Sequence, residues 1–231
     1  MGHRWARASQ GGGVLLLLVT IVGRAASPAP PPSWTSNFVT RVEALAVLQS
    51  LNADLLSHDS ATMTLEHWCD VHKLASPAKI TAVRVLDVDK LPTPEQRVDL
   101  SVAPTETVRY RRVRLTCGAV VLSEADNWYV PGRLTPEMNK QLDSSDTPFG
   151  LVVRPLNFRR HTVSSRLLWL ALPPGWEMKG AGGGGRIAGD QPMPPMLLEH
   201  RAILSLPDGT PFSEVVETYT DQVLAFPVPP P

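Results

Sequence analysis

The chain has 231 residues, and its 22 basic and 22 acidic residues give a formal net charge of zero. This length suits one domain with a single hydrophobic core. A balanced charge gives no electrostatic argument for a nucleic-acid partner or for an anionic membrane surface, so neither is expected.

The start of the chain has the pattern of a signal peptide. A basic head with Arg4 and Arg7 precedes an apolar run at 14–22, and the small residues Gly23 and Ala25 follow where a signal peptidase cleaves. The apolar run is too short to span a bilayer. We therefore expect cleavage, no membrane span afterwards, and a periplasmic or secreted protein. An uncleaved N-terminal anchor is the alternative.

The domain organisation follows from the proline distribution. Proline-rich stretches flank one long segment of mixed composition, and such stretches are typical of stiff linkers and tails. We expect a signal peptide at 1–25, a linker at 26–36, one domain at 37–226 and a proline-rich tail at 227–231.

Two helices are predicted at the front of the domain. Apolar residues recur at helical spacing across 38–57, and after Asp59 and Ser60 a second helix is predicted at 61–72. A third, short helix is predicted at 146–153, with Asp146 or Thr147 as its cap and proline in its first turn.

Most of the remaining chain is predicted to form strands. Gly118 marks a tight turn after the strongest of them, and a Pro-Asp-Gly turn joins the last two into a hairpin. The predicted strands are 80–86, 98–102, 107–117, 120–130, 199–206 and 211–220. Helices followed by hairpin-connected strands indicate an α+β domain with an antiparallel sheet.

Cys69 and Cys117 are the only cysteines. One disulfide between them is compatible with an oxidising compartment, but spacing does not show that they come within reach of each other. A disulfide and two free thiols are therefore both compatible with the sequence. No histidine cluster with metal-ligand spacing and no G-x-S-x-G, H-E-x-x-H or phosphate-binding loop is present, so no metal or cofactor is expected.

Strand alternation places one arginine among apolar residues. From Arg111 onward the odd positions Val113, Leu115 and Cys117 are apolar and the even positions are polar, so the odd face should turn inward. A guanidinium keeps its charge and therefore needs an anionic partner or a solvated cavity. Two interpretations remain: an internal salt bridge, or a pocket that receives the carboxylate of a ligand.

The last predicted strand carries one glutamate on each face, Glu214 and Glu217. Either is a candidate edge charge or a candidate internal partner for Arg111, and alternation does not choose between them. The short helix adds a further feature, because its first backbone N–H groups could bind an anion, although capping without a ligand is the alternative. These groups belong to Phe149, Gly150 and Leu151.

Three segments resemble chorismate pyruvate-lyases by their order and spacing. They are Arg111–Leu115, Asp146–Gly150 and the hairpin Glu199–Tyr219, and the resemblance covers about Leu51 to Phe226. The same layout is similar to the effector-binding domains of GntR-type regulators. The resemblance implies a sheet of about six antiparallel strands with flanking helices that enclose a small-molecule pocket.

The resemblance also implies roles for particular residues. Arg111 matches the arginine that holds the ring carboxylate, and Glu217 matches the glutamate near the hydroxyl end of the ligand. Gly150, with its neighbours Phe149 and Leu151, matches the backbone that contacts the bound aromatic acid. Ala61 falls where the lyases have a larger pocket-lining residue, which changes the expected shape of the pocket.

Three functions are compatible with these observations. The first is a carbon–oxygen lyase that removes pyruvate from chorismate, or from a related enolpyruvyl acid, to give a product of the 4-hydroxybenzoate type. Such an elimination needs positioning and charge stabilisation rather than a metal or a nucleophile. The second is a non-catalytic protein that binds a small aromatic carboxylate, and the third is an exported structural or interaction protein without a working pocket. A monomer is expected in each case. Export argues against the first, because chorismate is made in the cytoplasm.

Overall fold

The computed structural model describes residues 1–2, 33–178 and 192–228. The chain divides into two units, Met1–Pro30 and Pro31–Pro231. The predicted signal peptide beyond its first two residues, most of the linker and the end of the tail lie outside the described residues. Within the described part, no helix combines the length and the apolar character that a membrane span needs.

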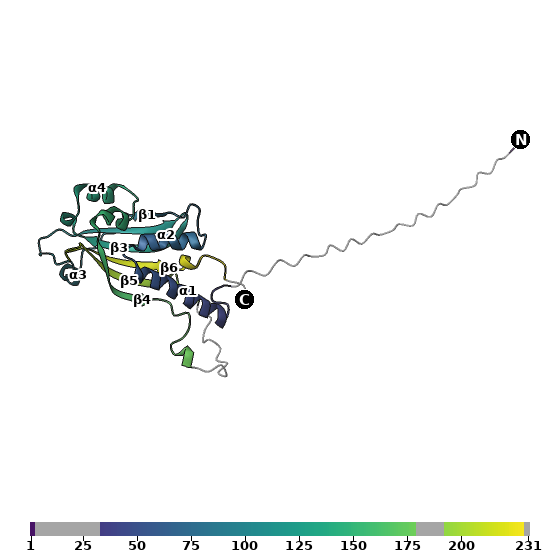
Figure 1. The fold of residues 1–231 in the computed structure, drawn as a ribbon. Coiled ribbons are helices and arrows are strands. Elements are labelled where there is room, and N and C mark those ends of the chain that lie inside the picture. The colour runs from purple at the N-terminus through teal and green to yellow at the C-terminus, as the bar shows by residue number, and fades with distance from the viewer. Residues whose placement is uncertain (3–32, 179–191, 229–231) are drawn as a thin grey trace. The chain divides into compact units, whose positions relative to one another are not determined.

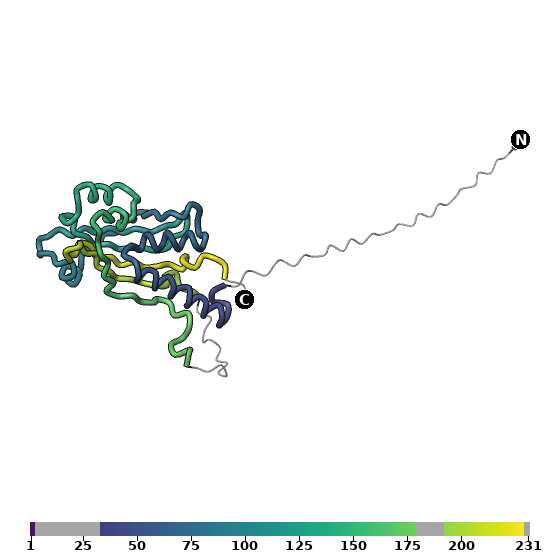
Figure 2. The backbone as a smooth tube through the Cα atoms, in the orientation of Figure 1, coloured from purple at the N-terminus to yellow at the C-terminus, as the bar shows by residue number. Residues whose placement is uncertain are grey.

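A six-stranded antiparallel sheet forms the centre of the second unit, in the order β1-β2-β3-β6-β5-β4 (Figure 1). The hairpins β2–β3 and β5–β6 meet in the middle, so that β6 lies between β3 and β5 (Figure 2). The strands are β1 (Ile80–Val85), β2 (Arg109–Cys117), β3 (Val120–Tyr129), β4 (Arg159–Leu167), β5 (Met196–Ser205) and β6 (Pro211–Thr220). The predicted α+β class with an antiparallel sheet of about six strands is confirmed.

Two helices pack on one face of the sheet, which we call the inner face. α1 (Phe38–Ser57) begins with a capping box between Asn37 and Thr40, and α2 (Ala61–Val71) begins at Ser60. Four of their leucines are buried with the odd-numbered apolar residues of β2 in the main core cluster: Leu48, Leu51, Leu55 and Leu65. The helical spacing in the sequence therefore marks the surface that covers the sheet.

The opposite face, the outer face, is covered partly by a short helix that the sequence analysis missed. The predicted strand at 98–102 is wrong, because α3 (Pro94–Asp99) covers its first two residues and a turn follows at Leu100 and Ser101. Thr93 accepts a hydrogen bond from the Gln96 backbone while the Gln96 side chain accepts one from the Thr93 backbone. This reciprocal cap, with proline at the first helical position, starts a helix that the apolar residues alone did not indicate.

The remaining helices surround the end of β3. α4 (Pro136–Ser144) was not predicted, and α5 (Phe149–Val153) begins later than predicted, with Pro148 at its cap. Neither Asp146 nor Thr147 caps α5, because Pro148 is the N-cap residue; the carbonyl of Asp146 instead accepts the backbone N–H of Ala82 on β1. Short 3-10 helices lie at Pro131–Arg133, Arg154–Leu156, Trp176–Met178 and Asp221–Leu224.

A disulfide joins Cys69 of α2 to Cys117 of β2, with the two Cα atoms 6.5 Å apart. The bridge that the sequence left open is therefore formed, and both cysteines are buried in the core. Because 48 positions separate them, closing this loop restricts the unfolded chain by about 4 kcal/mol in the chain-entropy model. The disulfide fixes α2 against β2.

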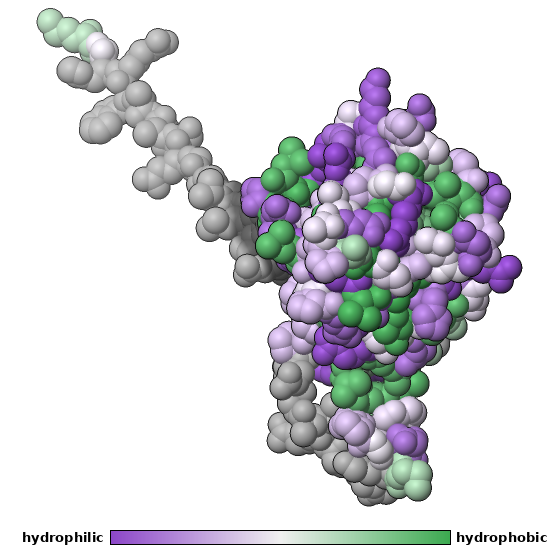
Figure 3. Space-filling model, turned by 90° about the vertical axis from the view of Figure 1, so that its left-hand side faces the viewer, coloured by the Kyte–Doolittle hydropathy of each residue, from purple (hydrophilic) through white to green (hydrophobic). Residues whose placement is uncertain are grey.

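The surface drawn in Figure 3 carries hydrophobic and hydrophilic residues side by side. Neither kind covers this face continuously, as is usual for the surface of a folded domain. This face therefore gives no argument for a docking surface.

Candidate functional site

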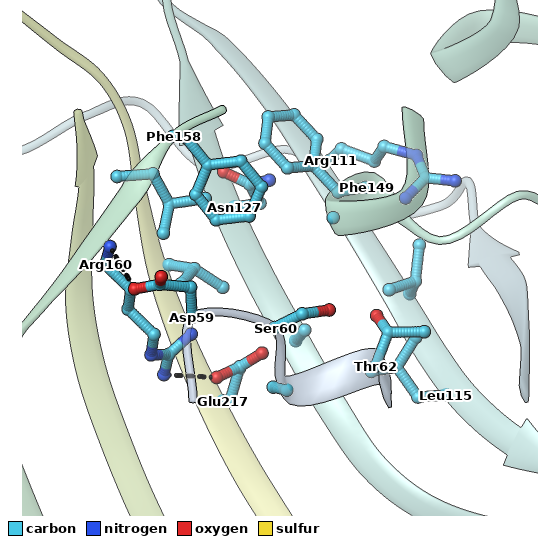
Figure 4. A pocket seen from close by; sticks show the side chains of 16 residues that line it. Asp59, Ser60, Thr62, Arg111, Leu115, Asn127, Phe149, Phe158, Arg160 and Glu217 are labelled. Carbon is cyan, nitrogen blue, oxygen red and sulfur yellow. Dashed lines mark hydrogen bonds and ion pairs between the residues drawn. The ribbon is translucent and has the colours of Figure 1, made fainter. Parts of the chain in front are cut away.

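A pocket of about 50 Å³ lies between the inner face of the sheet and the starts of α2 and α5 (Figure 4). A single buried water needs only about 10–15 Å³ on this scale, so the space suits a small organic molecule. The pocket is lined by Asp59, Ser60, Ala61, Thr62, Arg111, Val113, Leu115, Ala125, Asn127, Phe149, Gly150, Phe158, Arg160, Leu204, Val215 and Glu217.

Two neighbouring rows of side chains across β2, β3 and β6 form the floor of the pocket. In one row Arg111 lies opposite Asn127, which in turn lies opposite Val215. In the next row Glu217 holds the β6 position, beside small apolar side chains on β3 and β2. The antiparallel register thus brings together residues that are about a hundred positions apart in the sequence.

Arg111 lies on the inner face, where alternation places it, and is only 7% exposed. Its Nη2 atom donates to the carbonyl of Thr147 at 3.2 Å, while its Nε–H is buried without a partner. No acidic side chain in the described part of the chain forms an ion pair with it. Burial, assisted by the nearby charge of Arg84, lowers the pKa of Arg111 to about 10, so the guanidinium stays charged at neutral pH.

Neither candidate glutamate pairs with Arg111. Glu217 binds Arg160, whose Nη2 donates to Oε2 at 2.6 Å, and Glu214 binds Arg201 on the outer face. Tyr219 donates a second hydrogen bond to the same Oε2 of Glu217 at 3.1 Å. The internal salt bridge considered for Arg111 is therefore not found among the described residues.

Arg160 is the site residue that sequence reasoning missed. It lies on β4 beside Leu204 of β5, and its backbone N–H donates to Oδ1 of Asp59 at 3.0 Å. Burial acts to lower the pKa of Arg160, but the charge and hydrogen bond of Glu217, together with the nearby Tyr219 and Asp59, outweigh it and the pKa is raised. Because most positions of β4 are exposed or half-buried, alternation gave no signal for this residue.

The predicted residues on the helices divide into two groups. Phe149, Gly150 and Ala61 line the pocket, and Leu151 does not. The backbone N–H of Leu151 donates to the carbonyl of Pro148 at 3.0 Å, so it is not free to hold an anion.

The start of α2 faces α5 across the pocket. A Cβ placed on Gly150 would lie 3.6 Å from Oγ of Ser60 and 3.7 Å from Oγ1 of Thr62, which are ordinary contacts. Gly150 therefore leaves these two hydroxyl groups near the cavity, and Figure 4 shows both at the start of α2. They add neutral hydrogen-bonding groups to a lining that is otherwise mostly apolar.

His200 lies opposite Glu217 on the neighbouring strand β5. It is fully buried between the sheet and α1. Its Nε2 lies 2.7 Å from Oδ1 of Asn52, an acceptor, and so carries the proton, while Nδ1 has no partner. Burial lowers the pKa of His200 to about 4, so the ring is neutral at physiological pH. His200 contributes no charge to the pocket.

The buried charges that line the pocket do not cancel. Arg111 and Arg160 carry two positive charges and Glu217 carries one negative charge, which leaves one positive charge, since Asp59 is exposed to solvent. Arg111 and Arg160 lie at opposite ends of the view in Figure 4. A buried charge without a partner is costly, so the pocket is complementary to one anionic group near Arg111. The described residues include no group of side chains that could hold a metal ion.

Comparisons with known proteins identify a close relative and a distant structural likeness. The "Uncharacterized protein y4mC" of Sinorhizobium fredii (strain NBRC 101917 / NGR234) is 53% identical over 199 residues, which are 85% of this chain and 83% of that protein. No protein-family model matches the chain.

Among solved structures, the effector domain of PhnF from Mycobacterium smegmatis is 14% identical, with a TM-score of 0.46. The match covers 71% of this chain and 89% of the PhnF domain. The GntR-family transcriptional regulator from Enterococcus faecalis V583 is 10% identical with a TM-score of 0.40, and covers 64% of this chain and 99% of its own. Both TM-scores are below 0.5, so this likeness says nothing about what the chain binds.

Proposed function

This chain belongs to one family with y4mC of Sinorhizobium fredii, and for it we propose the binding of a small monocarboxylic acid in the pocket between α2, α5 and the sheet. Arg111 holds the carboxylate, and the apolar side chains around it hold a compact body the size of one ring. Pockets of this kind, largely apolar with a few placed polar groups, are typical small-molecule sites.

The observation that carries this proposal is the state of Arg111. It is buried, charged and without an acidic partner in the described residues, and its only protein acceptor is one carbonyl. A ligand carboxylate would satisfy the free Nε–H and a terminal N–H in a bidentate pair, which is the strongest arrangement available to a guanidinium. The net charge of the lining supports one carboxylate rather than two.

The side chains beside the cavity favour an aromatic acid. Phe149 and Phe158 line the pocket, as do Val113 and Val215 from the floor. Aromatic and branched side chains pack well against a flat ring. The sequence resemblance to chorismate pyruvate-lyases points to the same ligand class, and 4-hydroxybenzoate is the probe that it suggests.

Thermal unfolding of the purified protein with and without 4-hydroxybenzoate tests the proposal. A ligand that binds only the native state raises the unfolding midpoint, and the shift keeps growing with the logarithm of ligand concentration above the Kd. We expect a midpoint that rises with concentration for 4-hydroxybenzoate and does not rise for 4-hydroxybenzyl alcohol, which has the ring but no carboxylate. Equal shifts with the two compounds would contradict a carboxylate site.

A second candidate function is elimination of pyruvate from chorismate. In this reaction the C–O bond between enolpyruvate and the ring breaks, and the ring loses a proton, which the departing group takes up as it becomes pyruvate. Chorismate has two carboxylates, so Arg160 would have to receive the second while it keeps Glu217. The buried second guanidinium at the far end of the pocket is the observation that favours this candidate. Incubation with chorismate and detection of 4-hydroxybenzoate tests it.

We also propose export of the chain to an oxidising compartment. Two observations support it: the signal-peptide pattern of the sequence and the disulfide between Cys69 and Cys117. Disulfides persist mainly in secreted and periplasmic proteins. Fusion of residues 1–30 to a reporter that is active only outside the cytoplasm tests the proposal, and an inactive reporter would contradict it.

A further inference from the structure

We propose that Arg160 is a positioning residue: it fixes the carboxylate of Glu217 so that one oxygen is presented to the ligand, and the pocket thereby selects acids that carry a hydrogen-bond donor far from their carboxylate. This inference rests on the proposed binding of a monocarboxylic acid at Arg111. It adds a residue on β4 to the site and assigns it a role that acts through Glu217.

The two oxygens of Glu217 have different surroundings. Oε2 accepts from Nη2 of Arg160 at 2.6 Å and from the hydroxyl of Tyr219 at 3.1 Å. Oε1 accepts from no group among residues 33–178 and 192–228, and Figure 4 shows it turned toward the space beside α2. Two donors on one oxygen fix the plane of the carboxylate, and the other oxygen remains an acceptor for the ligand.

Arg160 is held firmly enough to act in this way. Its side chain is 5% exposed and that of Glu217 is 8% exposed, so water does not screen the pair. Its backbone is fixed on one side by Leu204 of β5 and on the other by the Asp59 carboxylate. A residue supported on a strand in this way positions its partner more sharply than one on a loop.

The chemistry of Glu217 explains why its partner matters for selectivity. A carboxylate oxygen that is held in place accepts a hydrogen bond from a donor on the ligand. Without Arg160 the carboxylate would keep one donor, Tyr219, which does not fix its plane, so Oε1 would no longer be held toward the ligand. The pocket would no longer distinguish a ligand that offers a donor from one that does not. Arg160 should therefore affect which acid is preferred more than how tightly the common carboxylate is bound.

The test compares 4-hydroxybenzoate with benzoate by calorimetric titration of the full chain. Both acids present the same carboxylate to Arg111, and only the first offers a distal hydroxyl. A hydrogen bond to a charged acceptor corresponds to a preference of about tenfold or more for 4-hydroxybenzoate in the native protein. In Arg160→Gln we expect this preference to fall to about twofold or less, with benzoate affinity within about threefold of the native value.

Two further variants provide controls for charge and for the strand. Arg160→Lys keeps a cation that can reach Glu217 and should retain most of the preference. Arg166→Gln removes a similar pair on the same strand, in which Nη2 of Arg166 lies 2.9 Å from Oε1 of Glu199 outside the pocket. This variant should bind both acids as the native protein does. A role of Arg160 in folding alone would weaken both acids together and leave their ratio unchanged.

The pair can also be removed without leaving a buried charge. Replacement of a buried ion pair by apolar residues is often neutral for stability, so Arg160→Met combined with Glu217→Leu keeps the test open if Arg160→Gln does not fold. We expect Glu217→Leu and the double variant to show the same ratio, near one. A tenfold preference retained in Glu217→Leu would mean that Arg160 itself contacts the hydroxyl, and would overturn the inference.

The outcomes separate this inference from the proposed function. Binding of both acids with an unchanged ratio in Arg160→Gln overturns the role of Arg160 alone. Absence of binding for both acids in the native protein overturns the monocarboxylate site and the inference with it.

Discussion

Neighbouring arginines on β2 differ completely in their partners. Arg111 faces the inner side of the sheet and hydrogen-bonds one carbonyl, whereas Arg112 faces the outer side and lies 2.6 Å from Oε2 of Glu124 and 3.6 Å from Oδ1 of Asp126. The chemical group is the same, and only the direction of the side chain along the strand differs. The outer arginine is paired with acids of the fold, and the inner arginine has no acidic partner among the described residues.

A second arginine on the outer face is also paired with acids of the protein. Arg201 of β5 binds Glu214 at 2.8 Å, Asp99 at 2.6 Å and Glu95 at 3.0 Å, and so links the sheet to α3. The hydrogen bond with Glu214, together with the charge of that residue, raises the pKa of Arg201. The comparison teaches that a half-buried arginine indicates a ligand site only when its own protein does not supply the acid.

The largest effect should come from Arg201→Ala. This change leaves Glu214, whose side chain is fully buried, with only Gln96 as a partner. It also removes the cation that Glu214 shares with Glu95 and Asp99. Removal of one partner of a buried ion pair destabilises a protein by about 3–5 kcal/mol. Chemical denaturation should show this loss as a lower midpoint with an unchanged slope. A loss below about 1 kcal/mol would mean that the outer face does not depend on its ion pairs.

Arg111→Ala should have the opposite profile. Loss of a bidentate charge-assisted pair should weaken 4-hydroxybenzoate binding by about 100-fold, while the free energy of unfolding changes by less than about 1 kcal/mol. The fold loses little, because the guanidinium has one protein acceptor and its burial is unfavourable. Calorimetric titration and urea denaturation on the same sample measure both quantities. An unfolded variant would show that Arg111 is structural after all.

These differences explain which parts of the site the sequence predicts. The position of Arg111 follows from alternation along one strand, because Val113 and Leu115 mark the inner face. The acidic partners of the arginines do not follow from alternation, because they depend on the order of strands in the sheet. Alternation puts Glu214 and Glu217 on different faces, and only the pairing of β6 with both β3 and β5 shows which face is the inner one and which arginine each glutamate binds.

The errors have physical reasons of the same kind. Val98 and Val102 suggest β structure and so predict a strand in place of the end of α3. The side-chain cap at Thr93 instead starts a helix. Arg160 was missed because β4 is an edge strand with little burial, so alternation is weak there. Local propensity predicts elements, but pairing and caps decide which residues face the pocket.

The stability of the protein should also fall in mild acid, because the inner face holds a buried neutral histidine. His200 has a pKa of about 4 in the folded protein against 6.5 for a free histidine. Between these values the unfolded state binds more protons, so stability falls as pH drops. The loss should be about 2 kcal/mol between pH 7.5 and pH 5. In His200→Gln, whose amide can still donate to Asn52, the slope of unfolding free energy against pH should flatten in this range; an unchanged slope would show that His200 is protonated without cost.

The smallest effect should come from Arg112→Ala, which is also the strictest test of the comparison. Glu124 keeps a second partner in Arg114, 3.1 Å away, and Asp126 keeps Lys90 and the hydroxyl of Tyr110. Because each acid retains a cation, the loss of stability should stay below about 1 kcal/mol, as for partly exposed ion pairs. The affinity for 4-hydroxybenzoate should remain within about twofold of the native value, since the side chain lies across the sheet from the pocket. If Arg112→Ala weakened ligand binding as much as Arg111→Ala does, the effect would follow from the charge of the strand as a whole. The direction of the side chain could then no longer distinguish a structural arginine from a ligand-binding one.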